Sequence, residues 1–147
     1  MKRNEANEPV ASAVRLELPP QAVSIAVARA VIRRIVTFRD DDAQSSFLVA
    51  FTEIAANAID EHERIGSAEP ICVEVRSGSI DLVSVVDSGE GLQVESPLES
   101  GPSAPKNASE RGRGLALAYA FIDRMEIDST TDGTTVRLPL TGIGLVR

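Results

Sequence analysis

The feature that most limits how this chain can fold is a long segment in which apolar residues recur at every third or fourth position. Between about residues 43 and 64, this spacing brings Phe47, Phe51, Ile54 and Ala58 onto one face of a helix. The preceding stretch FRDDDAQSS places acidic residues where a helix N-terminus favours them. The pattern predicts a helix with one face turned toward the core.

Two polar residues of the same segment, Glu53 and Asn57, are four positions apart and therefore share a face of that helix. With about 100° per residue, they lie roughly 80 to 100° around the helix from the apolar stripe. This predicts that both side chains lie at the edge of the core. Polar pairs at this spacing are also common on solvated helix faces, so the pair alone does not define a site.

Segments with apolar residues at every second position predict β-strands on both sides of this helix. SAVRLELP alternates apolar and charged residues before a proline pair, and a first helix is expected from 21 to about 36. After the long helix, PICVEVRSG and SIDLVSVVD predict a hairpin with its turn at 77–79. RGRGLALAYAFIDRM predicts a further helix, and MEIDSTTDGTTVRLPL predicts a closing hairpin that turns at Asp132 and Gly133.

The expected order is therefore strand, helix, helix, two strands, helix, two strands. Such an order predicts an α/β two-layer sandwich, with a mixed, mostly antiparallel sheet and helices on one face. The first helix, with Arg29 and Arg33 one turn apart, has a broad apolar surface. That surface is a candidate for partner contact or for burial against the sheet.

The size and charge of the chain restrict the class of protein. Its 147 residues suit a single domain over 12–147, after a flexible tail at 1–11. The formal net charge of −7 argues against direct binding to nucleic acid, which depends on Lys and Arg. The single cysteine, Cys72, excludes an internal disulfide framework, and no apolar run approaches the roughly 20 residues of a membrane span. We therefore expect a cytoplasmic protein without a membrane segment.

Two glycine-containing turns and one long polar loop are candidates for ligand contact. DSGEGL follows a predicted strand, and GRGL precedes the predicted helix at 115–124. Glycine lets a backbone approach a phosphate closely, and a helix N-terminus favours negative charge. Both motifs also occur as ordinary turns and helix starts. Residues 93–110 hold three prolines and show no periodicity, which suggests a lid.

Taken together, four segments resemble the four ordered motifs of the GHKL superfamily of ATP-binding domains. They are EIAAN at 53–57, DSGEG at 87–91, GRGLALAYAFIDRM at 112–125 and GTTVRL at 133–138. The phrases RGRGL and GTTVRL, with the leading strand and helix, are similar to the bacterial anti-sigma-factor serine kinase branch. The resemblance covers roughly residues 12 to 140. It implies the histidine-kinase-like ATP-binding fold, with ATP and Mg²⁺ as cofactors.

The resemblance also implies a role for each matching residue. Asn57 would coordinate the Mg²⁺ that bridges the ATP phosphates, and Glu53 would act as the general base toward the attacking hydroxyl. Asp87 would accept a hydrogen bond from the adenine amino group, with Gly89 and Gly91 allowing the base to lie close.

Further positions match the adenine side and the lid. Thr134 would assist adenine binding through water. Gly112 and Gly114 would close the lid onto the phosphates, and Arg111 would reach the γ-phosphate. Lys106, within the 93–110 lid, is a further candidate for this role.

The chain departs from the family pattern at one position. Many members carry a histidine eight residues after the base, whereas this chain has Glu61 there and His62 one residue later. Because a slip of one residue rotates a helical side chain by about 100°, His62 is not expected to replace that histidine. We expect His62 to be exposed at the helix end, and Glu61 either to weaken nucleotide affinity near the phosphates or to point to solvent.

The resemblance implies a serine/threonine protein kinase that uses Mg-ATP. It would phosphorylate a small STAS-type anti-sigma-factor antagonist and sequester a sigma factor when free of that antagonist. The apolar surface of the 21–36 helix is the candidate for contact with the sigma factor or for a homodimer. The alternative is a nucleotide-gated binding regulator with weak or no kinase activity.

Overall fold

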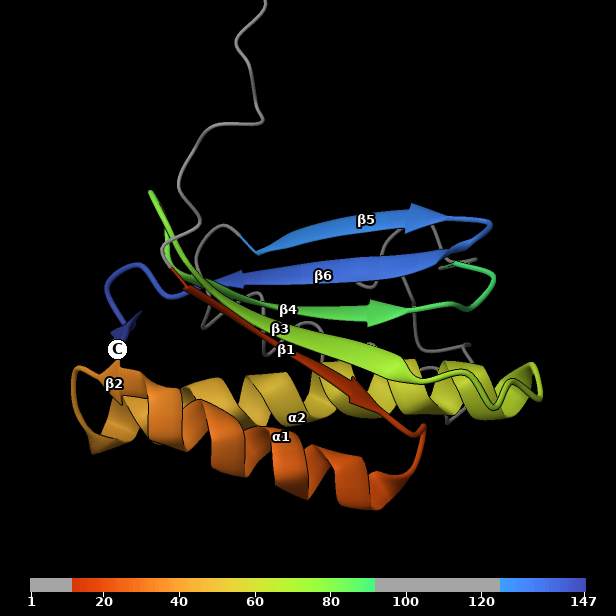
Figure 1. The fold of residues 1–147 in the computed structure, drawn as a ribbon, viewed down its shortest axis with the longest axis horizontal. Coiled ribbons are helices and arrows are strands. Elements are labelled where there is room, and N and C mark those ends of the chain that lie inside the picture. The colour runs from red at the N-terminus through yellow and green to blue at the C-terminus, as the bar shows by residue number, and fades with distance from the viewer. Residues whose placement is uncertain (1–11, 92–124) are drawn as a thin grey trace, which may run out of the picture.

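The computed structural model describes residues 12–91 and 125–147, which form a β-sheet with two helices on one face (Figure 1). In chain order the elements are β1 (Ser12–Leu18), α1 (Ala22–Ile35), β2 (Val36–Phe38), α2 (Asp41–Arg64), β3 (Ile71–Ser77), β4 (Leu82–Asp87), β5 (Glu126–Thr130), β6 (Gly133–Pro139) and β7 (Gly144–Val146). Five of these strands form a sheet in the order β1-β3-β4-β6-β5, and every pair among them is antiparallel. This is the two-layer α/β sandwich that the sequence predicted.

The two predicted hairpins set the register of the sheet. β3 and β4 pair with Val75 opposite Val83, and β5 and β6 pair across the turn that ends at Gly133. β4 and β6 lie side by side in the middle of the sheet, which brings Asp87 directly opposite Thr134. Two residues almost fifty positions apart in the sequence therefore meet at one end of the sheet.

Helix α2 begins where the sequence predicted helix-start chemistry. Asp40 is the N-cap residue, and its carboxylate Oδ1 accepts a hydrogen bond of 2.7 Å from the backbone N–H of Ala43. The predicted apolar stripe is buried against the sheet, and its members are Phe47, Phe51, Ile54 and Ala58. Glu53 and Asn57 are half-buried, which confirms their predicted place at the edge of the core.

The sequence did not predict the small sheet formed by β2 and β7. The first helix was expected to reach about Val36, but it ends at Ile35, and Val36 begins a three-residue strand that pairs with β7. Strand β7 thus fastens the C-terminal end of the chain to the connection between α1 and α2 (Figure 1).

Helix α1 has one buried face and one exposed face. Ser24, Ala28 and Ile32 face the interior, whereas Val23 and Val27 are 63% and 45% exposed. One side of this apolar surface is therefore buried, as one interpretation predicted, and partner contact on the open side stays a prediction. In the described part of the chain, neither helix is both long and apolar enough to cross a bilayer.

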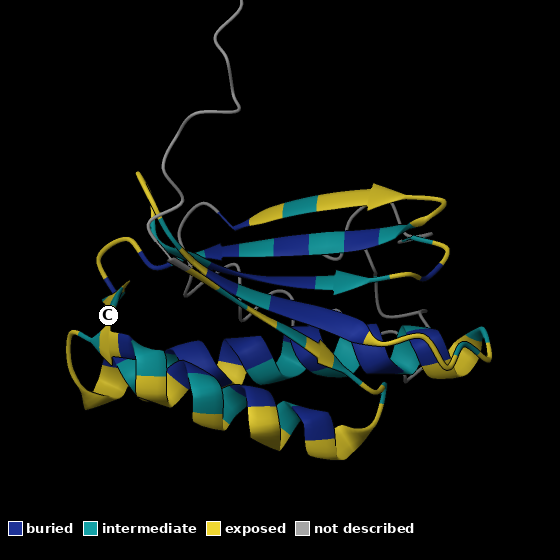
Figure 2. Cartoon of the chain, viewed as in Figure 1, coloured by how far each residue is buried: buried dark blue, intermediate teal, exposed yellow. Residues whose placement is uncertain are grey.

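The core lies between the sheet and the helices (Figure 2). Its largest fully buried apolar side chains come from α1, β2, α2, β3, β6 and the turn after β6. They are Ile32, Val36, Phe47, Leu48, Phe51, Ile54, Ile71, Val73, Leu138 and Leu140. One polar side chain, His62, is buried as completely as these.

Candidate functional site

A pocket opens between the C-terminal half of α2 and the end of the sheet where Asp87 and Thr134 meet. Its walls are mostly apolar, and a few polar groups stand at its rim, as in most small-molecule sites. The residues that line it are Ile54, Asn57, Ala58, Glu61, Val85, Asp87, Gly91, Ile127, Thr134 and Val136. Four residues that the sequence singled out as binding groups, Asn57, Asp87, Gly91 and Thr134, therefore face one cavity.

Helix periodicity explains how α2 contributes to the pocket. Asn57 and Glu61 are one turn apart and both line the cavity, whereas the intervening Ala58 contributes a small apolar surface. Glu53 lies one turn before Asn57 and is half-buried, but it is not part of the pocket lining. Its neighbour Ile54 does line the cavity, so Glu53 lies beside the pocket rather than in its wall.

Asp87 is the last residue of β4, and its carboxylate has little access to water. Burial raises the pKa of Asp87, and the backbone N–H groups of Gly89 and Thr134, which bond to the carboxylate, offset part of that increase. The Gly89 N–H donates to Asp87 Oδ1 at 2.9 Å. A half-buried carboxylate held in this way is a specific acceptor for a ligand N–H group.

Thr134 completes the sheet side of the pocket. Its side chain is 7% exposed, and its Oγ1 lies 3.0 Å from Ser129 Oγ on the neighbouring strand β5. Because either hydroxyl can be the donor in this pair, Thr134 keeps hydrogen-bonding capacity toward the cavity. Asp87 and Thr134 together give the pocket a polar edge on otherwise apolar walls.

The backbone conformation and the close packing at position 91 require glycine. Its φ of 85° lies in the left-handed region, and a Cβ on this residue would collide with the carbonyl oxygen of Thr130. Gly89 is less confined, because a Cβ there would meet the Cγ of Glu61, which belongs to a flexible side chain. Both glycines of DSGEG therefore allow close packing beside Asp87.

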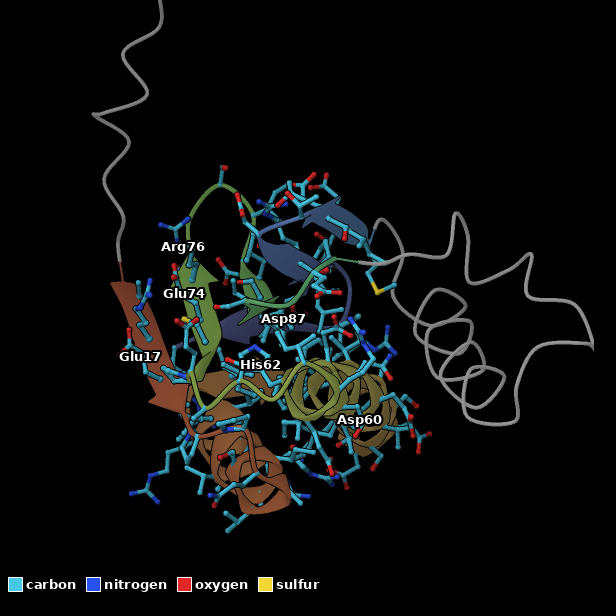
Figure 3. The ribbon with its side chains drawn as sticks, turned by 90° about the vertical axis from the view of Figure 1, so that its right-hand side faces the viewer. Glu17, Asp60, His62, Glu74, Arg76 and Asp87 are labelled. Atoms are coloured by element: carbon cyan, nitrogen blue, oxygen red, sulfur yellow. The ribbon has the colours of Figure 1, made fainter. Side chains whose placement is uncertain are left out.

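The structure corrects the expected position of His62. The sequence suggested an exposed residue at a helix end, but the His62 side chain is 0% exposed and lies between α2 and the turn after β4 (Figure 3). Its Nε2 accepts a 2.9 Å hydrogen bond from the Ser88 N–H, and its Nδ1 lies 2.9 Å from the carbonyl oxygen of Glu69. The helix was predicted correctly, but α2 stays packed against the sheet for one turn longer than expected.

A signal for this burial was present in the sequence. His62 follows Ala58 by four positions, so it continues the stripe of Phe47, Phe51, Ile54 and Ala58 along the same face of α2. The apolar pattern predicts burial only for apolar residues, so it does not predict the burial of a histidine that has two hydrogen-bond partners.

Of the two expected positions of Glu61, the structure excludes the one in solvent, because its carboxylate is paired: Arg64 donates to Oε1 at 2.7 Å and to Oε2 at 3.0 Å. An effect of Glu61 on nucleotide affinity stays a prediction. The N–H of Glu90 donates to the same Oε1 at 3.2 Å. Arg64 also donates to the Glu90 carboxylate at 3.2 Å. Contact with these two carboxylates raises the pKa of Arg64, and Glu61 is the larger cause. Glu61 is therefore braced against the turn after Asp87, with its charge paired.

The remaining predicted site residues lie outside the described residues. They are Arg111, Gly112, Gly114 and Lys106, together with the 93–110 lid. Their roles stay predictions, and so do those assigned to Glu53, Asn57, Asp87, Gly89, Gly91 and Thr134.

The described residues fit Mg²⁺ only as a partner of a phosphate ligand. No group of three or more His, Cys, Asp or Glu side chains in residues 12–91 and 125–147 could hold a metal ion alone. Asn57 offers one carboxamide oxygen at the pocket. A single oxygen ligand is sufficient where phosphates and water fill the other positions, as Mg²⁺ prefers in nucleotide sites.

Comparison with known proteins identifies the class to which this fold and pocket belong. The family model for the histidine kinase-like ATPase domain matches residues 18–140. The chain therefore belongs to the histidine kinase-like ATPase family, within the GHKL superfamily. Membership makes it an ATP-binding domain of the kinase or ATPase type, for which Mg²⁺ is the usual companion ion. No curated protein matches the sequence significantly.

Two solved structures are similar to this chain at low sequence identity, and the first of them shares its fold. The RsbU and RsbW domains of Rv1364c from Mycobacterium tuberculosis are 18% identical, with a TM-score of 0.60 over 87% of this chain and 32% of that chain. The present chain thus spans about a third of that neighbour. The histidine kinase domain of the blue-light activated histidine kinase from Erythrobacter litoralis EL346 is 16% identical, with a TM-score of 0.45 over 89% of this chain and 67% of the other.

Proposed function

We propose that this protein is a Mg-ATP-dependent serine/threonine protein kinase and anti-sigma factor. It phosphorylates a small STAS-type anti-sigma-factor antagonist and sequesters a sigma factor when free of that antagonist. The observation that best supports nucleotide use is the convergence of Asn57, Asp87 and Thr134 on one pocket in a member of an ATP-binding family. The choice of branch rests on the motifs RGRGL and GTTVRL.

The pocket suggests how the nucleotide lies. Adenine enters between the apolar walls and donates its amino group to the Asp87 carboxylate, and the phosphates extend along α2 toward Asn57. Mg²⁺, held by the Asn57 oxygen and the phosphates, would offset the negative charge of the phosphoryl groups. Glu53, one turn farther along α2, then lies on the side where the γ-phosphate and the attacking hydroxyl meet.

In the transfer step the serine hydroxyl of the antagonist attacks the γ-phosphorus. A bond forms between the serine oxygen and phosphorus, the bond from phosphorus to the β–γ bridging oxygen breaks, and ADP leaves. Glu53 takes the hydroxyl proton, and Arg111 offsets charge on the transferred group. The products are phosphoserine on the antagonist and ADP.

A second candidate is a nucleotide-gated binding regulator with weak or no kinase activity. The position of Glu53 favours it, because the proposed base lies outside the lining of the described pocket. In this case ATP and ADP alter partner binding without phosphoryl transfer.

The partner surface we propose is the open side of α1. Val23 and Val27 are exposed there, and Arg33 is an exposed cation of the same helix, whereas Arg29 is half-buried and donates to Thr52 Oγ1 at 2.9 Å. A sigma factor or a second copy of the chain would cover this side.

The deciding experiment is transfer of γ-³²P from Mg-ATP into proteins of the source cell's lysate. Wild type is compared with Glu53→Ala and with Glu63→Ala, a matched change at an exposed glutamate of the same helix. We expect acid-stable label on a small protein with wild type and Glu63→Ala, and its loss by a factor of at least about 100 with Glu53→Ala. Phosphoamino acid analysis then identifies serine or threonine.

One result would contradict the kinase proposal, and another would contradict only the role of Glu53. No transfer by wild type that binds ATP would favour the nucleotide-gated regulator. Equal transfer by wild type and Glu53→Ala would show that Glu53 is not the base.

A further inference from the structure

The turn that follows β4 is held to α2 by side chains of two adjacent residues. Three successive N–H groups of this turn each have a side-chain acceptor. Ser88 N–H donates to His62 Nε2 at 2.9 Å, Gly89 N–H to Asp87 Oδ1 at 2.9 Å, and Glu90 N–H to Glu61 Oε1 at 3.2 Å. Two adjacent side chains of α2, His62 and Glu61, therefore hold the backbone that follows Asp87.

The hydrogen bonds of His62 define its tautomer. A backbone N–H can only donate, so Nε2 must accept from Ser88 and carry no proton. Nδ1 then carries the proton and donates to the carbonyl oxygen of Glu69 at 2.9 Å. The ring is 0% exposed and bonded at both nitrogens, so it forms a rigid strut from the segment after α2 to the turn after β4.

Glu61 braces the same turn from the pocket side. Its carboxylate bonds to Arg64, and Arg64 also contacts Glu90 Oε2 at 3.2 Å. The Cγ of Glu61 fills the space that a side chain at Gly89 would need. Glu61 and His62 therefore both hold the turn to α2 by hydrogen bonds, and the Glu61 side chain also fills the space beside Gly89.

We infer that His62 is a positioning residue for nucleobase recognition. By holding Ser88 N–H, it fixes the turn whose Gly89 N–H orients the Asp87 carboxylate, so that this carboxylate meets the exocyclic amino group of adenine. His62 does not itself touch the ligand. The inference rests on the proposed role of Asp87 as the adenine acceptor and adds to it the group that sets its direction.

The test compares two substitutions that separate the nitrogens of the ring. In His62→Gln the carboxamide oxygen can take the place of Nε2 and accept from Ser88. In His62→Asn the shorter carboxamide can replace Nδ1 toward Glu69 but does not reach Ser88. Glu63→Ala, at the neighbouring exposed position, is the control. All variants are first checked for folding by circular dichroism.

The readout is the ratio of the dissociation constants for ITP and ATP, measured by calorimetry. Inosine has a carbonyl where adenine has the amino group, so the ratio reports how well Asp87 is aimed. We expect His62→Asn to lower this ratio by about tenfold, which is the usual cost of weakening one hydrogen bond to a charged group. His62→Gln and Glu63→Ala should keep it within about threefold of wild type. A residue needed only for folding would weaken ATP and ITP equally.

The outcomes separate this inference from the assignment of Asp87. A wild-type protein that does not discriminate ATP from ITP would refute the role of Asp87 and, with it, the role of His62. Discrimination in wild type with an unchanged ratio in folded His62→Asn would overturn the His62 inference alone.

A second measurement covers the case in which the variants do not fold. His62 is the only histidine of the chain, so its ¹⁵N resonances need no further assignment. We expect the tautomer with the proton on Nδ1, both in the empty protein and with ATP bound. A proton on Nε2 would exclude the bond from Ser88 and overturn the inference.

Discussion

Replacing Asp87 by asparagine tests the pocket most directly, because the two side chains have the same shape. The carboxylate accepts from the N–H groups of Gly89 and Thr134 and would accept from adenine as well. Asparagine has one acceptor oxygen, so its NH₂ group must face one of these donors. Losing a hydrogen bond to a charged acceptor costs about 2 to 3 kcal/mol, or roughly 30- to 150-fold in the dissociation constant for ATP.

The stability of the empty protein should respond differently. Because burial raises the pKa of Asp87, the ionised form is disfavoured in the empty pocket, and a neutral side chain relieves this cost. Because the NH₂ group facing a backbone donor opposes this gain, we expect the melting temperature to change little, together with the weaker binding measured by calorimetry. Asp42→Asn, at the exposed first turn of α2, is the control for the loss of one charge. An ATP affinity within threefold of wild type would refute the assignment of this pocket to the adenine ring.

Three further predictions follow from the same contacts. Gly91→Ala should lower the free energy of unfolding by about 1 to 3 kcal/mol and weaken ATP binding, because its Cβ meets Thr130. Gly66 has a similar φ of 68° but open space around it, so chemical denaturation should show a smaller loss of stability for Gly66→Ala. Phe51→Ala, at a fully buried position, should cost about 3 to 5 kcal/mol of unfolding free energy, and a loss below roughly 1.5 kcal/mol would contradict its place in the core. Adenine binding favours the ionised Asp87, so the pKa of Asp87 is lower in the complex than in the empty protein, where burial raises it. The affinity for ATP should therefore be full above the pKa of the empty protein and fall as the pH drops through it. Calorimetry should not find this dependence in Asp87→Asn.

The helix α2 and the two hairpins could be predicted because their signals are local. The stripe from Phe47 to Ala58 extends over several turns, and both hairpins alternate apolar and polar residues around short turns. Such periodicity reports which side of an element faces the core. Given the order of the elements, the two-layer fold then follows from the need to cover one face of the sheet.

The small sheet of β2 and β7 could not be predicted in this way. Each strand has three residues, which is too short for alternation to be distinguished from chance, and the partners are more than one hundred positions apart. The pairing also depends on contacts outside the strands, since Arg39 N–H donates to the Ile143 carbonyl at 2.7 Å and Arg147 N–H to the Ile35 carbonyl at 2.8 Å. Long-range pairing of this kind is a property of the folded chain.

Four of the residues singled out in the sequence, Asn57, Asp87, Gly91 and Thr134, line one pocket, but the contacts that hold this pocket together were not predicted. Sequence reasoning identified Asp87 and its glycines, yet it treated Glu61 and His62 as a single question about one missing histidine. In the structure the two side chains have different surroundings, because successive helical residues point about 100° apart. Glu61 continues the edge defined by Glu53 and Asn57 and reaches the pocket, whereas His62 continues the buried stripe and reaches the backbone behind it.

This division changes what the departure from the family pattern means. A carboxylate at position 61 would repel phosphates only if it were unpaired and close to them, but Glu61 is paired with Arg64 and occupied by the Glu90 N–H. It lies beside the turn after Asp87, at the end of the pocket where the base would bind. Glu61 should therefore affect recognition of the base more than transfer of the phosphoryl group, and the absence of a histidine at this position does not by itself argue against kinase activity.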